Sequence, residues 1–375
     1  MIPIAKPYLT EEEAKAAYDT ILTGWITQGP RVQEFEENFA KYIGSPFAVA
    51  VSNCTTALHL SLIVVGIGKE DEVICPSMSY IATANAIKYV GAKPVFAEVN
   101  EAYNLDVKHV ETLITSKTKG ILLVHQIGMP ADIDSFRELC DKHKLVLIED
   151  AACAVGSAYK GKKVGTHSDL VCFSFHPRKV ISTGDGGMIT TQREDFYQRL
   201  KLLRQHGMSV NDRVRHSSDK IIFEDHLEVG YNYRLTDIQA SVGIKQLQKL
   251  DWLISERRMI AAKYINSFKH IDCIRLPLEA ENYFSNYQSF SIYLKATSPI
   301  KRNELMQKLL DAGIASRRGI MCSHRETAYK KEYEGLKLVI SEDLQDNSIL
   351  LPLYVPMPQS DIQKVVDTVK SLLEK

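Results

Sequence analysis

Short apolar segments alternate with amphipathic stretches through the first half of the chain. Residues do not alternate between apolar and polar within these segments, which is typical of strands buried on both faces of a sheet. The amphipathic pattern between them, for example over 135–144, predicts helices and therefore βαβ crossovers in a mostly parallel sheet. The seven segments are FAVAVS (47–52), DEVICPS (71–77), KPVFAEV (93–99), GILLVHQ (120–126), LVLIED (145–150), LVCFSF (170–175) and GMITT (187–191).

The second half has a different pattern. Residues 237–268 predict one long helix that leads out of the first domain, and the strand-like segment SFSIYLKA follows it. Helical patterns over 300–312 and 360–373 complete a small α+β domain. We therefore expect an α/β protein with a seven-stranded, helix-flanked sheet in a large domain (1–245) and a smaller C-terminal domain (246–375). Ligands of such sheets bind beyond the carboxyl ends of the strands, so functional residues are expected there.

Composition and charge narrow the possible functions. The chain has 375 residues, of which 45% are hydrophobic and 25% charged, a composition that excludes a disordered protein. Lys plus Arg and Asp plus Glu both number 46, so no net charge favours nucleic acid or an anionic membrane as partner. Without a signal-peptide pattern or an apolar run long enough to span a membrane, we expect a cytoplasmic protein. Seven scattered cysteines without a CxxC pair predict reduced thiols and no metal site.

Asp150 and Lys179, which lie at or shortly after the ends of predicted strands, suggest one type of reaction. Asp150 ends LVLIED, and Lys179 lies five residues after Ser174, in SFHPRK. Singly, Asp150 is equally consistent with a helix cap and Lys179 with a solvated loop residue. Together they are the two groups that a protein supplies to pyridoxal phosphate: a carboxylate for the pyridine nitrogen and an amine for a Schiff base. As general base and acid, Lys179 needs a lowered pKa, which we expect from burial and from Arg178.

A polar turn at residues 52–56 follows a predicted strand and begins a predicted helix, SNCTTALHLSL. Free amides and the helix dipole at such a turn bind a phosphate. The same residues are also typical of ordinary helix capping. Ser174, at the end of another strand, can add a hydroxyl to this anion site.

Eight motifs taken together resemble the sugar aminotransferases of the DegT/DnrJ/EryC1/StrS family, which have the fold of type I pyridoxal-phosphate enzymes. The resemblance covers nearly the whole chain, and eight motifs in the same order make it specific although each one is weak. The motifs are GWITQGPRVQEFE, SNCTTALHLSL, PSMSYIATANAI, HQIGMPADID, IEDAACAVGSAYKGKKVGTHSD, FSFHPRKVISTGDGGMITT, GYNYRLTDIQASVG and LPLYVPM.

The resemblance implies roles for individual residues. Lys179 corresponds to the Schiff-base lysine, and Asp150 to the aspartate paired with the pyridine nitrogen. Ser174 and the amides of Cys54 and Thr55 correspond to the phosphate contacts.

Two further positions extend this cofactor site. Tyr80 lies where the family has an aromatic ring stacked on the cofactor, usually Phe or Trp. Asn232 corresponds to an asparagine that reaches the phosphate of the neighbouring subunit. The resemblance therefore implies a homodimer with shared active sites.

The chain departs from the family pattern at three positions. Cys153 replaces the usual Gln or His beside the cofactor's phenolic oxygen, so one hydrogen-bond donor is weaker. Cys54 replaces Gly or Ala, and Asp185 replaces the Glu of GEGG. None of these changes removes a required group.

The resemblance also implies a reaction. Relatives that are sugar dehydratases have histidine at the position of Lys179, so the intact lysine favours amino transfer. An amino acid such as glutamate would then aminate a keto or aldehyde sugar. Most relatives use nucleotide-linked sugars destined for surface polysaccharide, lipopolysaccharide or glycosylated metabolites. A regulatory protein on an inactivated fold is a remote alternative, disfavoured because Lys179 and Asp150 are both present.

The candidate substrate residues lie in GIASRRGIMCSHRETAY. Arg317, Arg318, His324 and Arg325 form a basic cluster there, and arginine pairs bind phosphate or carboxylate groups. A solvated basic loop is the competing interpretation. A sugar with its own carboxylate, such as an oxidised octulosonate, would suit these arginines as well as a nucleotide pyrophosphate.

Overall fold

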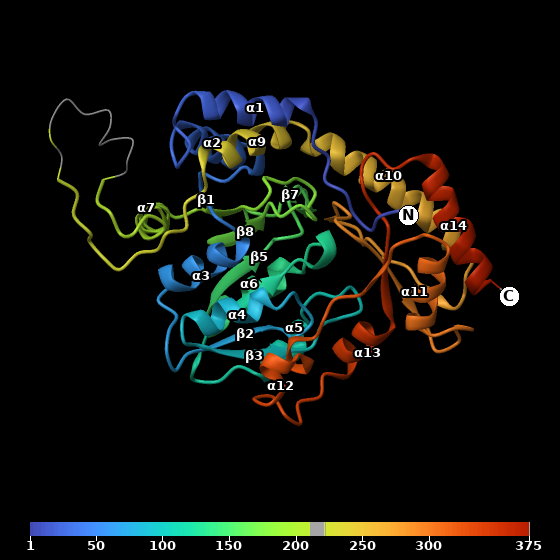
Figure 1. The fold of residues 1–375 in the computed structure, drawn as a ribbon. Coiled ribbons are helices and arrows are strands. Elements are labelled where there is room, and N and C mark those ends of the chain that lie inside the picture. Colours follow the sequence, from blue (N-terminus) through green and yellow to red (C-terminus); the bar gives the residue numbers. More distant parts are fainter. Residues whose placement is uncertain (211–220, 222, 375) are drawn as a thin grey trace.

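One sheet forms the centre of the larger part of the molecule, and the C-terminal part lies beside it (Figure 1). The structure, a computed structural model, describes residues 1–210, 221 and 223–374. The seven predicted segments form strands β1 (Phe47–Val51), β2 (Glu72–Pro76), β3 (Lys93–Ala97), β4 (Thr118–Val124), β5 (Val146–Asp150), β8 (Leu170–Ser174) and β9 (Gly187–Thr191). Their order is β1-β9-β8-β5-β4-β2-β3, and only pairs with β9 are antiparallel among these strands. The predicted mostly parallel sheet is confirmed.

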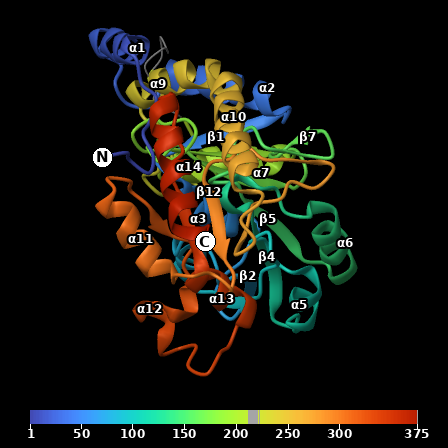
Figure 2. The same cartoon turned by 90° about the vertical axis from the view of Figure 1, so that its right-hand side faces the viewer.

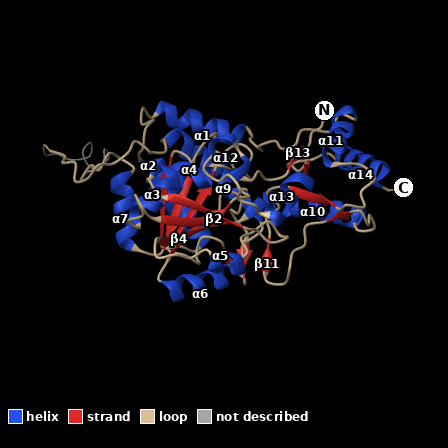
Figure 3. Cartoon of the chain, turned by 90° about the horizontal axis from the view of Figure 1, so that it is seen from below, coloured by secondary structure: helices blue, strands red, loops and turns tan. Residues whose placement is uncertain are grey.

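Helices cover both faces of this sheet, which explains the continuous apolar pattern of its strands (Figure 3). Within β8, Leu170 and Cys172 belong to one buried cluster, whereas Val171 and Phe173 belong to another. The first cluster includes residues of α3 (Cys54–Val64), α4 (Ala82–Tyr89) and α7 (Glu194–Leu203). Helices α2 (Pro30–Ile43) and α9 (Asp237–Gln248) contribute to the second, and α5 (Val107–Thr112) and α6 (Ile133–His143) to a third beside β4.

Side-chain caps set the starts of several helices. Before α3, the Asn53 side chain accepts a hydrogen bond from the Thr56 amide at 2.9 Å, so the helix begins directly after β1. Thr236 and Gln239 form the equivalent capping box of α9. Helix α1 (Glu11–Leu22) has a capping box as well and packs beside α9 at the top of Figure 1.

The C-terminal part contains a four-stranded antiparallel sheet, in the order β10-β12-β14-β13. Its strands are β10 (Ile274–Arg275), β12 (Phe290–Leu294), β13 (Arg317–Arg318) and β14 (Ser348–Leu351), so SFSIYLKA forms a strand as predicted. Helices α11 (Arg302–Asp311) and α14 (Gln359–Leu373) match the two predicted helices, and α13 (Val339–Asn347) is additional. Figure 2 shows α14 in front of this sheet, beside α10.

The long predicted helix over 237–268 is two helices. Helix α9 ends at Gln248 and α10 (Leu250–Phe268) begins after Lys249, whose φ of −98° and ψ of −4° interrupt the regular geometry. The start of the chain also joins the C-terminal part, because Ile2 forms a bridge with Ile314. Smaller elements are β6 (Ala158–Tyr159), β7 (Lys162–Lys163), β11 (Tyr283–Phe284), α12 (Thr327–Lys330), and the short helices Gln126–Gly128 and Ser323–Arg325.

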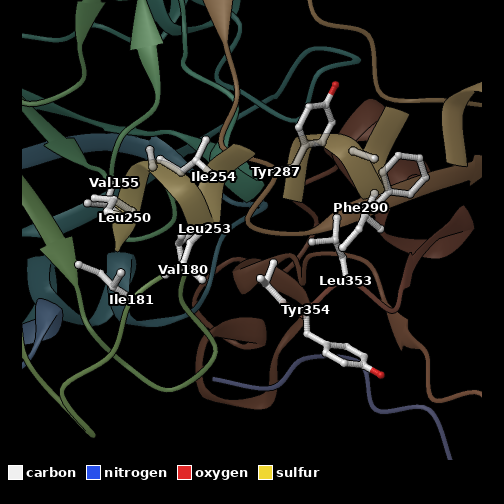
Figure 4. Packing of buried hydrophobic residues seen from close by; sticks show 14 of the residues in the cluster. Val155, Val180, Ile181, Leu250, Leu253, Ile254, Tyr287, Phe290, Leu353 and Tyr354 are labelled. Atoms are coloured by element: carbon white, nitrogen blue, oxygen red, sulfur yellow. The ribbon is translucent and has the colours of Figure 1, made fainter. Parts of the chain in front are cut away.

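Helix α10 packs against both parts of the molecule. Figure 4 shows its residues Leu250 and Leu253 in one buried cluster with Val180 and Ile181, which directly follow Lys179. The same cluster continues to Phe290 in the C-terminal sheet. A continuous apolar core therefore joins the lysine loop to the C-terminal part.

The remaining features of the fold are the apolar character of its helices and the state of its cysteines. Within the described residues, no helix is long and apolar enough to cross a membrane. All seven cysteines are free thiols, and all except Cys153 are buried.

Candidate active site

Asp150, Cys153 and Lys179 come together at the carboxyl ends of two neighbouring strands. Asp150 ends β5, and Lys179 follows β8 after a short loop. The Nζ atom of Lys179 lies 3.0 Å from the Sγ atom of Cys153. This is the edge of the sheet at which ligands of parallel α/β proteins bind.

Asp150 is buried and has two hydrogen-bond donors. The Thr83 hydroxyl donates to Oδ2 at 2.9 Å, and the Ala152 amide donates to Oδ1 at 3.1 Å. Burial raises the pKa of Asp150, whereas these two donors and the nearby Lys179 act to lower it. The carboxyl group is therefore held in one orientation beside a cationic neighbour.

The expected lowering of the Lys179 pKa is not seen. Burial acts to lower this pKa, but Cys153, Cys54 and Asp150 act in the opposite direction, and the net shift is upward. Arg178, which we expected to help lower the pKa, is exposed. The neighbours of Lys179 are groups that can become anions and not cations. The expected downward shift of the Lys179 pKa was therefore wrong.

Contacts on both sides hold the lysine loop. The Lys179 amide donates to the His176 carbonyl at 2.8 Å and closes a turn. From the C-terminal part, the Gln288 side chain donates to the Arg178 carbonyl at 2.8 Å. Val180 and Ile181 anchor the other side in the apolar core (Figure 4). The loop is therefore positioned by residues far away in the sequence.

The start of α3 forms a candidate phosphate site. Cys54 and Thr55 are its first two residues, whose amides have no partner within the helix. Gly187 of β9 lies against this turn: a Cβ atom there would come within 2.8 Å of the Cys54 nitrogen, so only glycine fits. Gly187 pairs with Ser174, which brings that buried hydroxyl to the same place.

Tyr80 and Asn232 are both exposed. Tyr80 precedes α4, and its carbonyl accepts from the Thr83 amide at 3.1 Å, so it lies one turn from the group that binds Asp150. The whole residue is 62% exposed. Asn232 lies in a segment beside the end of β1, because the Ser52 amide donates to the Tyr233 carbonyl at 2.8 Å.

The basic C-terminal segment does not form one cluster of free cations. Arg317 and Arg318 are exposed in β13. Arg325 pairs with Asp346 at 2.9 Å. His324 is buried: its Nδ1 atom lies 2.6 Å from the Ser77 hydroxyl, and its Nε2 atom 3.3 Å from the Glu342 carboxylate. Arg318 also lies 3.4 Å from the Glu326 carboxylate, so Arg317 is the exposed arginine of β13 for which no ion pair is seen among the described residues, while the histidine ties two parts of the chain together.

Sequence reasoning missed three residues that support this site. Ser79 and Thr83 share a hydroxyl contact of 2.8 Å next to Asp150. Asn286 donates to the Cys153 and Val155 carbonyls, both at 2.9 Å, and so holds the turn that carries Cys153. The motif PSMSYIATANAI contains the two hydroxyls, but no sequence signal places Asn286 at this turn.

This chain matches known proteins over nearly its whole length. The model of the DegT/DnrJ/EryC1/StrS aminotransferase family matches residues 7–370. An uncharacterised protein of Methanocaldococcus jannaschii is 36% identical over 378 residues, covering 100% of this chain and 98% of that protein.

Solved structures are also similar to this chain over its full length. A Streptococcus pneumoniae protein named as a sugar aminotransferase, solved in PMP, PLP and apo forms, is 30% identical; its PMP form has a TM-score of 0.94 over 100% of this chain and 99% of that one. Helicobacter pylori PseC, an aminotransferase of pseudoaminic acid biosynthesis, is 28% identical, with a TM-score of 0.93 over 100% and 99%. From these matches, the chain belongs to the DegT/DnrJ/EryC1/StrS family and is a sugar aminotransferase that uses pyridoxal phosphate.

Proposed function

We propose that this aminotransferase moves an amino group from L-glutamate to a keto or aldehyde sugar linked to a nucleotide. The observation that carries the chemistry is the buried Asp150 carboxylate near the Lys179 amine at the carboxyl ends of β5 and β8. When bound, pyridoxal phosphate supplies an electron sink that stabilises negative charge on the substrate carbon. The product sugars would enter surface polysaccharide, lipopolysaccharide or glycosylated metabolites.

The surroundings of Asp150 and Lys179 support their proposed roles. Asp150 would bind the protonated pyridine nitrogen, since Thr83 and Ala152 hold both of its oxygens in place. Lys179 would attach the cofactor aldehyde and, when released, move a proton at the substrate carbon. Its upward pKa shift favours the ammonium form before the cofactor is bound.

The start of α3 supports a phosphate role for Cys54, Thr55 and Ser174. Two free amides, a helix N-terminus and a hydroxyl form a donor set that suits a phosphate dianion. The close approach of Gly187 keeps this turn against the sheet. Tyr80 would stack on the cofactor ring from the start of α4, and Cys153 would lie beside its phenolic oxygen.

The sugar would lie toward the C-terminal part. Arg317 is exposed and offers a guanidinium group to an anionic substrate, and Arg318 would add a second one on release from Glu326, which it contacts at 3.4 Å. We do not extend this role to His324, because both of its ring nitrogens contact protein groups.

An amination screen tests the substrate proposal. Nucleotide-linked keto sugars and a keto-acid octulosonate would each be incubated with holoenzyme and L-glutamate, and 2-oxoglutarate would be measured. We expect turnover with a nucleotide-linked sugar. Turnover confined to the keto-acid sugar would replace the proposed substrate class, and release of no 2-oxoglutarate with any sugar would contradict amino transfer.

We further propose a homodimer in which Asn232 reaches the partner's cofactor phosphate. The segment that leads to Asn232 carries exposed apolar side chains: Phe223, Leu227 and Val229 are 90%, 61% and 88% exposed. Exposed apolar side chains gathered in one segment favour an interface with a second copy. The segment is drawn as part of the extension at the left of Figure 1.

Complementation between two inactive variants tests the shared site. Lys179→Ala and Asn232→Ala chains would be mixed under conditions that exchange subunits. If sites are shared, each mixed dimer has one intact site, and activity returns; the two variants incubated apart serve as controls. No recovery in mixed dimers, or a monomer by light scattering at assay concentration, would contradict the proposal.

A further inference from the structure

Cys153 differs from the other six cysteines in its surroundings. It is half-buried, whereas the others are buried. Its Sγ atom lies 3.0 Å from the Lys179 amine. Asn286 fixes its backbone through the Cys153 carbonyl, so the thiol is held at the amine by the fold.

The chemistry of an oxidised thiol makes this contact significant. A peroxide converts an accessible cysteine to a sulfenic acid, which then condenses with a thiol or a nitrogen nucleophile. An amine in contact with the sulfur competes well with a distant thiol because little movement is needed. The amine here is the one on which amino transfer depends.

We propose that Cys153 and Lys179 form a peroxide-sensitive site in which oxidised Cys153 closes a sulfur–nitrogen bond to the Lys179 amine. In the first step the thiol gives two electrons to a peroxide; hydrogen peroxide yields the sulfenic acid and one water. In the second step the Lys179 ammonium releases one proton to solvent and the neutral amine attacks the sulfur; the sulfur–oxygen bond breaks as the sulfur–nitrogen bond forms, and the hydroxyl leaves with an amine proton as a second water. A dithiol reductant supplies two electrons and restores both groups.

The state of the cofactor should control this reaction. Lys179 is free only while the cofactor carries the amino group or is absent, because the aldehyde form binds the amine covalently. Holoenzyme exposed to an amino donor should therefore be more sensitive than holoenzyme without one. This dependence rests on the proposed amino transfer, whereas the sulfur–nitrogen bond itself depends only on the Cys153–Lys179 contact.

Cys54 is the competing partner for Cys153. Burial is the main reason that the pKa of Cys54 lies well above its ordinary value; Asp150 and Cys172 raise it further, and nearby Cys153 contributes the least. Cys54 is buried at the start of α3, whereas the Lys179 amine contacts the sulfur directly. The proposal therefore commits to the amine, and a Cys153–Cys54 disulfide is a contradicting outcome.

Peptide mass mapping tests the proposal. Holoenzyme, with and without L-glutamate, would be treated with hydrogen peroxide, alkylated and digested with trypsin. We expect a cross-linked pair of peptides that contain Cys153 and Lys179 and have lost two hydrogens. Trypsin should fail to cleave after the modified Lys179, and cleavage should return after dithiothreitol. The glutamate-treated sample should give severalfold more cross-link.

Two variants sharpen the result. Cys153→Ser should abolish the cross-link, and Cys140→Ala, a change on α6 outside the site, should leave it unchanged. A sulfinic acid at Cys153, or a disulfide to Cys54, with normal cleavage at Lys179 would overturn the inference. Protein that still forms 2-oxoglutarate but gives no cross-link would overturn this inference alone, and a cross-link without amino transfer would count only against the proposed function.

Discussion

The two halves of the candidate site differ in how firmly the fold holds them. At the cofactor half, Asp150 is buried and bound by two donors, and Lys179 lies in a loop anchored from the C-terminal part. At the proposed substrate half, Arg317 and Arg318 are exposed on a short outer strand. The proposed roles therefore assign the chemistry to buried, tightly bound groups and substrate choice to surface side chains that can change without unfolding the protein.

The largest effect is expected at the lysine. Lys179→Ala should lower kcat for amination by about 10³-fold or more, since the amine is both the cofactor attachment and the proton carrier. Steady-state kinetics would measure this, with circular dichroism to confirm an intact fold. Near-normal amination by the folded variant would remove Lys179 from the cofactor half.

A smaller but still large loss is expected at the carboxylate. Asp150→Asn retains the shape and the Thr83 contact but cannot keep a pyridine nitrogen protonated, so kcat should fall roughly 100-fold or more. Thr83→Val is the matched test of the supporting hydroxyl and should have a milder effect. If Asp150→Asn stays within a fewfold of the parent, Asp150 is only a structural residue.

A substitution in the proposed substrate half should change KM and leave kcat nearly unchanged. Arg317→Ala should raise KM for an anionic sugar by about tenfold while kcat changes little, because the lost contact is present in both ground and transition states. KM for L-glutamate should stay constant and is the internal control. An equal fall in kcat for both substrates would place Arg317 in the cofactor half.

The smallest effect concerns His324. Burial lowers the pKa of His324 below the ordinary 6.5 although Glu342 acts to raise it. As pH falls through about 6.5 the unfolded chain binds a proton that the folded protein does not, so His324 makes stability decline on acidification. His324→Gln should reduce this decline of the free energy of unfolding between about pH 7.5 and 5.5, measured by urea unfolding. The exposed His270→Gln is the control; an equal change in both variants would contradict the account.

The elements that could be predicted are those with strong local signals. All seven strands of the main sheet were predicted because burial on both faces leaves an uninterrupted apolar run, and β5 placed Asp150 at the functional edge. The division of 237–268 into two helices was missed because the break falls at Lys249, where the sequence has neither Pro nor Gly to mark it.

The contacts that could not be predicted join residues distant in sequence. Thr83 meets Asp150 across 67 positions, and Gln288 meets Arg178 across 110. The pKa of Lys179 was misjudged for the same reason, because Cys153, Cys54 and Asp150, which raise it against the effect of burial, come from other parts of the chain. His324 was expected among substrate residues, and only the fold shows Ser77 beside it.

Chemical trapping of the cofactor tests the central claim most directly. Purified protein loaded with pyridoxal phosphate would be treated with borohydride, which makes the bond between cofactor and lysine permanent, and the labelled peptide would be identified by mass spectrometry. The account predicts that the cofactor is fixed on Lys179 and that Lys179→Ala protein is not labelled. Label on another lysine, or none on protein that aminates a sugar, would contradict it.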